Sequence, residues 1–224
     1  MERNEFNHML AWLDLRNDLV FNKIPPAKYR YYLDSALAFG EQAAARLNGQ
    51  DIRQLCAQHQ IAIEIKKDDG LFFTVQFRAQ FEYSEKLSRR KITLYQPSLE
   101  SLLAGCASVG LVMSLDTIID IHLAHEFFHF LEYQQRPVSA SLEKVCNVAI
   151  GPFRRYSTVG ATSEIAAHRF CQRFHQLDYY PSYYDFLWLA HSGKQTQWEN
   201  ERCFAEAWQE MQAFGLTPQA DACL

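Results

Sequence analysis

The feature that most constrains this chain is an apolar segment near its middle that also carries ionisable side chains. Between residues 118 and 131 the large apolar side chains follow helical spacing; they are Ile118, Ile119, Ile121, Leu123, Phe127, Phe128, Phe130 and Leu131. Ser114 or Asp116 can cap a helix that runs to about Gln134. A buried helix seldom carries ionisable groups unless they are paired or bound to a metal. The segment therefore predicts a buried helix whose ionisable groups are paired or bound to a metal.

The ionisable groups form the motif His125-Glu126-Phe127-Phe128-His129. Two histidines four residues apart share one face of a helix and can bind the same metal ion. Zinc accepts nitrogen and oxygen donors, and Glu126 is placed to act on a metal-bound water as a general base. A shuffled chain of this composition would carry the motif roughly 0.02 times. We therefore expect a zinc site with His125 and His129 as ligands; hydrogen-bonded core histidines are the alternative.

A catalytic zinc needs a third protein ligand and an open position. Glu164 and His168 are four residues apart on a second predicted helix, which Thr162 or Ser163 opens and which runs to about Leu177. Either side chain could complete the site. We favour Glu164 as the ligand and expect His168 to support the site by a hydrogen bond. The alternatives are a helix N-terminal acid for Glu164 and a packed or surface histidine for His168.

His122 lies three residues before His125, on nearly the same helix face. As a fourth ligand it would close the coordination sphere and indicate a structural metal. Because ligands on adjacent turns would crowd each other, we expect a surface or hydrogen-bonded role instead.

The arrangement resembles the gluzincin metallopeptidases, in which H-E-x-x-H on one helix is followed by a glutamate ligand on a later helix. Within them it resembles the ImmA/IrrE-type group, where an aromatic residue follows six residues after that glutamate, as Phe170 follows Glu164. The likeness covers roughly residues 52–177 and departs from the pattern at His168, which stands where an acid or amide is usual. It implies a peptidase and a peptide or protein substrate such as a transcriptional regulator.

The resemblance also implies an oxyanion-stabilising tyrosine shortly before the ligand glutamate. Tyr156 is the matching residue, eight positions before Glu164, and ordinary aromatic packing is an equal alternative. Tyr133, His175 and Arg155 are weaker candidates for the same electrostatic task.

The remaining pattern predicts an α+β fold that is mostly helical, with a small, mostly antiparallel sheet beside the motif helix. Three helices are expected in residues 1–58, the first broken from the second at Pro25-Pro26. Alternating apolar residues predict strands at 61–65 and 71–77, paired as a hairpin around Asp68-Asp69-Gly70, and a third strand at 91–95. Helices are expected at 97–109, 183–191 and 197–214, and a long connection with one short helix at 137–160.

These elements suggest three regions that form one compact unit: an N-terminal helical region at 1–50, a zincin-like core at 51–178 and C-terminal helices at 179–224. The net charge of -4 does not suggest a nucleic-acid partner. The most apolar window, residues 102–115, is too short to cross a membrane and is expected to be a buried helix. The six scattered cysteines are expected to be free thiols, mostly buried, in a cytoplasmic protein.

The sequence therefore favours a zinc-dependent peptidase that uses a metal-bound water activated by Glu126. Two alternatives remain open. One is an interaction or regulatory protein in which a structural zinc only joins two helices. The other is a metal-dependent amidohydrolase that acts on a small molecule, because the substrate is set by the cleft rather than by the metal ligands.

Overall fold

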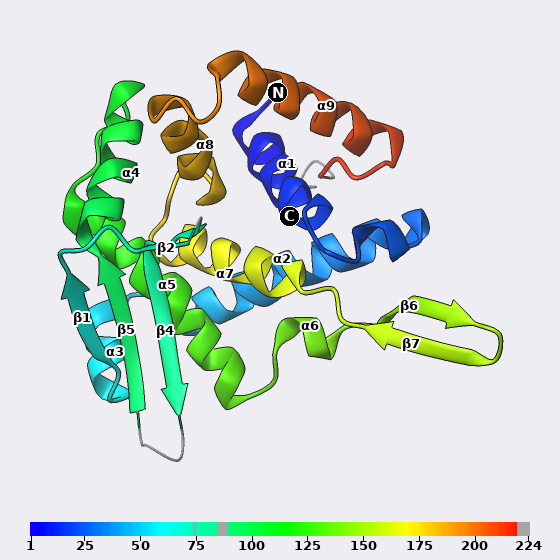
Figure 1. Cartoon of the computed structure of the whole chain (residues 1–224), viewed down its shortest axis with the longest axis horizontal. Helices are drawn as coiled ribbons and strands as arrows, with labels where there is room; N and C mark the ends of the chain where they lie inside the picture. Colours follow the sequence, from blue (N-terminus) through cyan, green and yellow to red (C-terminus); the bar gives the residue numbers. More distant parts are fainter. Residues whose placement is uncertain (74, 85–88, 219–224) are drawn as a thin grey trace.

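The structure is a computed structural model that describes residues 1–73, 75–84 and 89–218 (Figure 1). Its first 58 residues are helical, as predicted. Helices α1 (Arg3–Arg16) and α2 (Tyr29–Arg46) are separated by two single turns of 3-10 helix, η1 (Phe21–Lys23) and η2 (Pro26–Lys28). Proline at the start of η2 suits a first helical turn, where its missing N–H leaves no bond unmade. A short helix, α3 (Ile52–Gln58), leads into the sheet.

The main sheet has three strands in the order β1-β5-β4, where β1 is Ala62–Lys66, β5 is Arg89–Tyr95 and β4 is Ala79–Ser84. β5 is central because it carries the buried residues Ile92 and Leu94. β1 runs parallel to it and β4 antiparallel.

The predicted hairpin between residues 61–65 and 71–77 is wrong. Ile63 and Ile65 are 38% and 49% exposed, so β1 is a flanking strand and pairs with the buried β5. The residues after the turn form only a short ribbon of β2 (Leu71–Phe72) and β3 (Val75–Gln76), which pair with each other. Alternation reveals a strand but not its partner, and burial decided the pairing here.

The centre of the molecule is built from α4 (Gln96–Ser108), α5 (Leu115–Gln134) and α7 (Ala161–Phe174). α5 begins where the sequence predicted, because the Ser114 hydroxyl accepts a hydrogen bond from the backbone N–H of Thr117 at 3.0 Å. α5 packs against β4 on one side and α7 on another. The apolar window 102–115 is not one helix, since α4 ends at Ser108 and a loop precedes Ser114.

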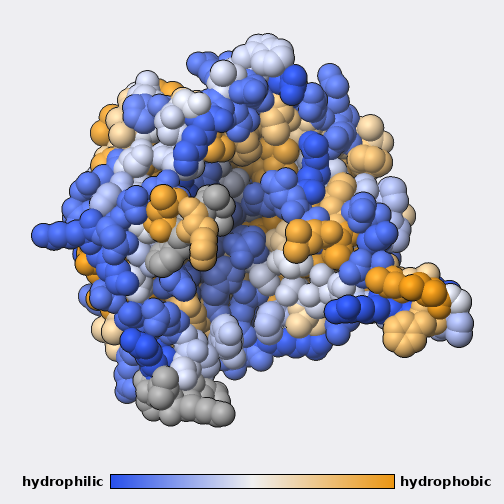
Figure 2. Space-filling model, in the orientation of Figure 1, coloured by the Kyte–Doolittle hydropathy of each residue, from blue (hydrophilic) through white to orange (hydrophobic). Residues whose placement is uncertain are grey.

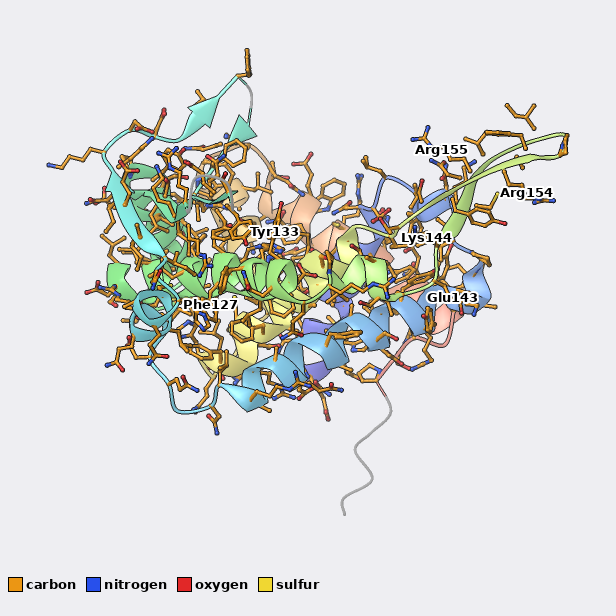
Figure 3. The ribbon with its side chains drawn as sticks, turned by 90° about the horizontal axis from the view of Figure 1, so that it is seen from below. Phe127, Tyr133, Glu143, Lys144, Arg154 and Arg155 are labelled. Atoms are coloured by element: carbon orange, nitrogen blue, oxygen red, sulfur yellow. The ribbon has the colours of Figure 1, made fainter. Side chains whose placement is uncertain are left out.

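The connection from α5 to α7 contains the expected short helix, α6 (Val138–Ser141), and a hairpin that was not predicted. Its strands are β6 (Val145–Ile150) and β7 (Phe153–Ser157), and Ile150 lies opposite Phe153 next to the turn. The hairpin projects away from the helices (Figure 1), and Arg154 and Arg155 lie far along it (Figure 3). Figure 2 shows hydrophobic residues on this projection.

The chain continues through α8 (Ser182–His191) and α9 (Gln197–Ala213). One apolar cluster surrounds α5 and the sheet, and a second gathers α1, α2 and α9; α7 contributes Phe170 to the first and Ile165 to the second. α2 lies against α7, and a Cβ on Gly40 of α2 would fall 2.2 Å from the Ala166 carbonyl oxygen, so only glycine permits this approach. The architecture is α+β and mostly helical, and most of its strand pairings are antiparallel, as predicted.

The five cysteines in the described part of the chain are free thiols, and Cys56, Cys106 and Cys171 are buried. Cys223 lies outside the described residues. Within the described ranges, none of the helices has the length and apolarity needed to cross a membrane.

Candidate metal centre

Helices α5 and α7 bring His125, His129 and Glu164 together. The Nε2 atoms of the two histidines lie 3.1 Å apart. Glu164 reaches them from the first turn of α7, with Oε2 at 3.2 Å from His125 Nε2 and Oε1 at 3.4 Å from His129 Nε2. One donor atom from each residue lies within 4.8 Å of the others, so the three form a group that could hold a metal ion. The side chain of Glu164 is 51% exposed, so the group is open to solvent.

A buried carboxylate fixes the tautomer of one histidine. His129 Nδ1 lies 2.9 Å from Oε2 of Glu132, whose side chain is only 8% exposed. The other oxygen, Oε1, accepts hydrogen bonds from the Val138 backbone N–H at 2.7 Å and the Ser163 hydroxyl at 2.8 Å. Because the carboxylate accepts, Nδ1 carries a proton, and Nε2, which faces His125 and Glu164, is the nitrogen left to bind a metal. The donor set therefore fits a metal ion that binds imidazole nitrogen and carboxylate oxygen.

The electrostatics of the group favour positive charge at its centre. Burial lowers the pKa of His129, but hydrogen bonds to Glu132 and Glu164 outweigh it and raise the pKa to about 10. Burial also acts to raise the pKa of Glu164, yet hydrogen bonds from His125 and His129 hold that pKa well below its usual range. Without a cation the carboxylates retain an additional proton on His129, and a bound metal would take the place of that proton.

Glu126 lies close to the three grouped donors. It lines a cavity with His125 and Glu164 but is not one of the three grouped donors. Burial raises the pKa of its carboxyl, and His125, His129 and the backbone of Phe81 only partly oppose the shift. A carboxylate with a raised pKa accepts a proton more readily than an exposed one, as a general base must.

His168 lies beside the donor group, against the ring of His125. Its ring lies against that of His125, with 5.0 Å between centroids, and its Nδ1 lies 2.9 Å from Oδ2 of Asp14 on α1. The hydroxyl of Tyr180 donates to the same carboxylate oxygen at 3.0 Å. Burial lowers the pKa of His168, but the carboxylates of Asp14, Glu164 and Asp185 together outweigh burial and raise the pKa above its usual value. His168 lies outside the three grouped donors, and its supporting role stays a prediction.

Other residues singled out in the sequence lie away from the grouped donors. His122 points its Nδ1 at the Ile118 carbonyl, 2.8 Å away, while lining the same cavity as Glu126. Tyr156 is 55% exposed on β7 and lines neither cavity described below, so its proposed role stays a prediction. Tyr133 is also exposed, and His175 Nε2 lies 3.0 Å from the Asp120 carbonyl.

Two cavities meet at Glu164 and His168. The larger, about 710 Å³, lies between α1, the base of the β6–β7 hairpin and the start of α7. The smaller, about 240 Å³, lies between α5, α8 and the segment before β4, and it contains His125, Glu126 and Arg78. Figure 2 shows this face hollowed near its centre, with hydrophilic residues in the hollow. Glu164 and His168 therefore line both cavities.

Three residues around the donor group were not predicted from the sequence. Glu132 is three residues after His129, a spacing that places both on one helix face, and this signal could have identified it. Asp14 and Arg78 reach the site only through the fold, and their sequence contexts carry no such signal. Comparisons with known protein families, with curated proteins and with solved structures give no match for this chain.

Proposed function

We propose that this protein is a zinc-dependent hydrolase that cleaves peptide bonds. The observation that carries the proposal is the convergence of His125 Nε2, His129 Nε2 and the Glu164 carboxylate, with Glu126 beside them and outside the donor group. Two imidazoles and one carboxylate with an open position are the ligand set of catalytic zinc. Zinc held there would polarise a carbonyl group and lower the pKa of a water molecule to about 7.

The residues of the chain supply the proton transfers. Glu126 accepts the proton of the attacking water and delivers it to the leaving amine, a role that its raised pKa supports. Glu132 keeps His129 in the tautomer that can bind the metal. Asp14 holds His168 against His125 and so restricts the orientation of that ligand.

Two further observations favour a peptide substrate. The cavities on both sides of the donor group suit a chain that continues in two directions. β4 is an edge strand beside α5, and the backbone of Phe81 on it reaches Glu126, so an extended peptide could pair along this edge. The gluzincin resemblance, and in particular the ImmA/IrrE-type pattern, adds a protein substrate such as a transcriptional regulator.

Two observations weigh against a structural metal. Among the described residues neither His122 nor His168 belongs to the donor group, and Glu164 remains half-exposed. A metal that only joined two helices would be expected to have a fourth protein ligand. An amidohydrolase acting on a small molecule is the second candidate, because the smaller cavity could accept one.

The decisive experiment combines metal analysis with a peptide library. Purified protein is loaded with zinc, its metal content is measured, and the library products are identified by mass spectrometry. We expect close to one zinc per chain and products that are absent with the Glu126→Gln variant at equal zinc content. Zinc well below half an equivalent would contradict the metal site. Full zinc occupancy with no peptide cleaved would instead contradict the peptidase.

A further inference from the structure

Arg78 lines the smaller cavity together with His125, Glu126 and Glu164. It belongs to the segment between β3 and β4, and its carbonyl oxygen accepts a hydrogen bond from the Tyr95 backbone N–H at 2.9 Å. Its guanidinium lies over the Trp188 ring, 4.8 Å from the centroid, and Trp188 is itself held by a 2.9 Å hydrogen bond from Nε1 to Ser101. The side chain is thus fixed in direction and only 17% exposed.

One edge of this guanidinium has no partner in the described part of the chain. Nη1 donates to the Asp185 carboxylate, but the buried Nε makes no hydrogen bond there. A buried unsatisfied donor is costly, and a guanidinium edge made of Nε and Nη2 matches the two oxygens of a carboxylate. Arg78 is therefore arranged to accept a second carboxylate beside the one it already holds.

The charged residues that line the two cavities indicate in which of them a substrate carboxylate would bind. Arg78 is the one Arg or Lys among the described residues that line either cavity. The larger cavity is lined by Asp14, Asp18 and Glu164 without a guanidinium or ammonium group. The smaller cavity is also lined by carboxylates, those of Glu126, Glu164 and Asp185, but only there can an anion meet Arg78. The smaller cavity is below the roughly 300–1,000 Å³ typical of ligand pockets, so it has room for only a short piece of chain.

We propose that Arg78 binds the free α-carboxylate of a peptide substrate, and that the enzyme removes one or two residues from the C-terminus. This inference rests on the proposed peptidase function and gives it a substrate class. Water adds to the scissile carbonyl, the C–N bond breaks, and the proton taken up by Glu126 passes to the amine of the departing piece. The rest of the peptide occupies the larger cavity, where no Arg or Lys among the described lining residues could hold that terminus.

The test uses peptides synthesised in two forms that differ only in a C-terminal carboxylate or carboxamide. Zinc-loaded wild-type protein should cleave the last or penultimate bond of the acid, with kcat/KM about 10–100-fold higher than for the amide. Arg78→Gln should remove this preference, and Arg78→Lys should restore part of it, since lysine keeps the charge without the fork. Asp185→Asn is the matched control: it removes the same ion pair and should keep the preference.

A binding measurement makes the proposal independent of turnover. Calorimetry with the tripeptide acid and amide, on the zinc-loaded Glu126→Gln protein and on the metal-free protein, should show that the acid binds at least tenfold more tightly. Adding Arg78→Gln should abolish that difference. Equal binding of acid and amide, or cleavage confined to internal bonds in both forms, would overturn the role of Arg78 and leave the peptidase intact. Selective binding without any cleavage would instead contradict the peptidase.

Discussion

Glu132 lies three residues beyond His129 on α5, and its buried carboxylate joins that histidine to the starts of two other helices. Oε2 meets His129 Nδ1, while Oε1 accepts from Val138 at the beginning of α6 and from Ser163 in the first turn of α7. Since Ser163 precedes Glu164 in the chain, the same carboxylate connects two of the grouped donors, His129 and Glu164, on different helices.

Replacing Glu132 should therefore weaken metal binding without touching a ligand. Glu132→Gln places an amide NH₂ toward either a histidine N–H or the Val138 N–H, so at least one hydrogen bond is lost. We expect zinc affinity to fall about 10–100-fold and thermal stability to fall as well. Competition with a chromophoric chelator measures the affinity. Glu201→Gln, at an exposed position on α9, is the control, and an unchanged affinity for Glu132→Gln would contradict this role.

Glu126 and Glu164 should respond differently to substitution. Glu126→Gln should retain zinc and abolish turnover, because an amide cannot accept the proton. Glu164→Ala should lose zinc affinity by more than the roughly 10–100-fold typical of a supporting residue. His168→Ala should fall within that range, since His168 bonds to Asp14 rather than entering the donor group. Normal zinc binding by Glu164→Ala together with its loss in His168→Ala would make the site a three-histidine one.

His8 should make the protein less stable in acid. Burial lowers the pKa of this α1 histidine from 6.5 to about 4, with Asp34 opposing and Arg169 and Arg30 assisting the shift. Between these pH values the unfolded chain binds a proton that the folded chain does not, so stability falls as pH falls from 6.5 to 4. The loss should be on the order of 2–3 kcal/mol.

Urea unfolding of the wild type and of His8→Gln from pH 7 to 4 measures this contribution as a difference between two curves. The variant should lose less stability over the window, and His191→Gln, at an exposed position on α8, should follow the wild type. Parallel curves for wild type and His8→Gln would contradict the prediction.

Gly40→Ala should push α2 away from α7. The added methyl would meet the backbone of Ala166, which cannot move as a side chain can. We expect a loss of about 1–3 kcal/mol and a lower melting temperature. Ala38→Ser, at an exposed position on the same helix, should stay within about 0.5 kcal/mol of the wild type. A melting temperature for Gly40→Ala equal to that of Ala38→Ser would show that the contact is relaxed without cost.

The helices and the donor group could be predicted because their signals are local. The spacing of His125 and His129, the Ser114 cap and the proline pair before α2 act within a few residues of chain. The pairing of β1 with β5 could not be predicted, since it depends on which strand is most buried. Residues 79–84 alternate as a strand should, so β4 was present in the pattern and was missed.

Arg78 escaped prediction for a different reason. Its significance comes from Asp185 and Trp188, about a hundred residues further along, and from a cavity that only the folded chain encloses. Tyr156 is the opposite case. Its position in the sequence suggested a role at the site, but its side chain is exposed on the hairpin and lines neither of the two cavities.

The hydrogen bond between Asp14 and His168 spans 154 residues. Contacts between segments so far apart in sequence form only after a large loss of chain entropy, so they tend to appear late in folding. On a ribosome, Asp14 would emerge long before its partner and would have to wait for α7 and Tyr180. The donor group is therefore completed late in synthesis, and an unfinished chain carries the H-E-x-x-H motif without the contacts from Asp14 and Tyr180.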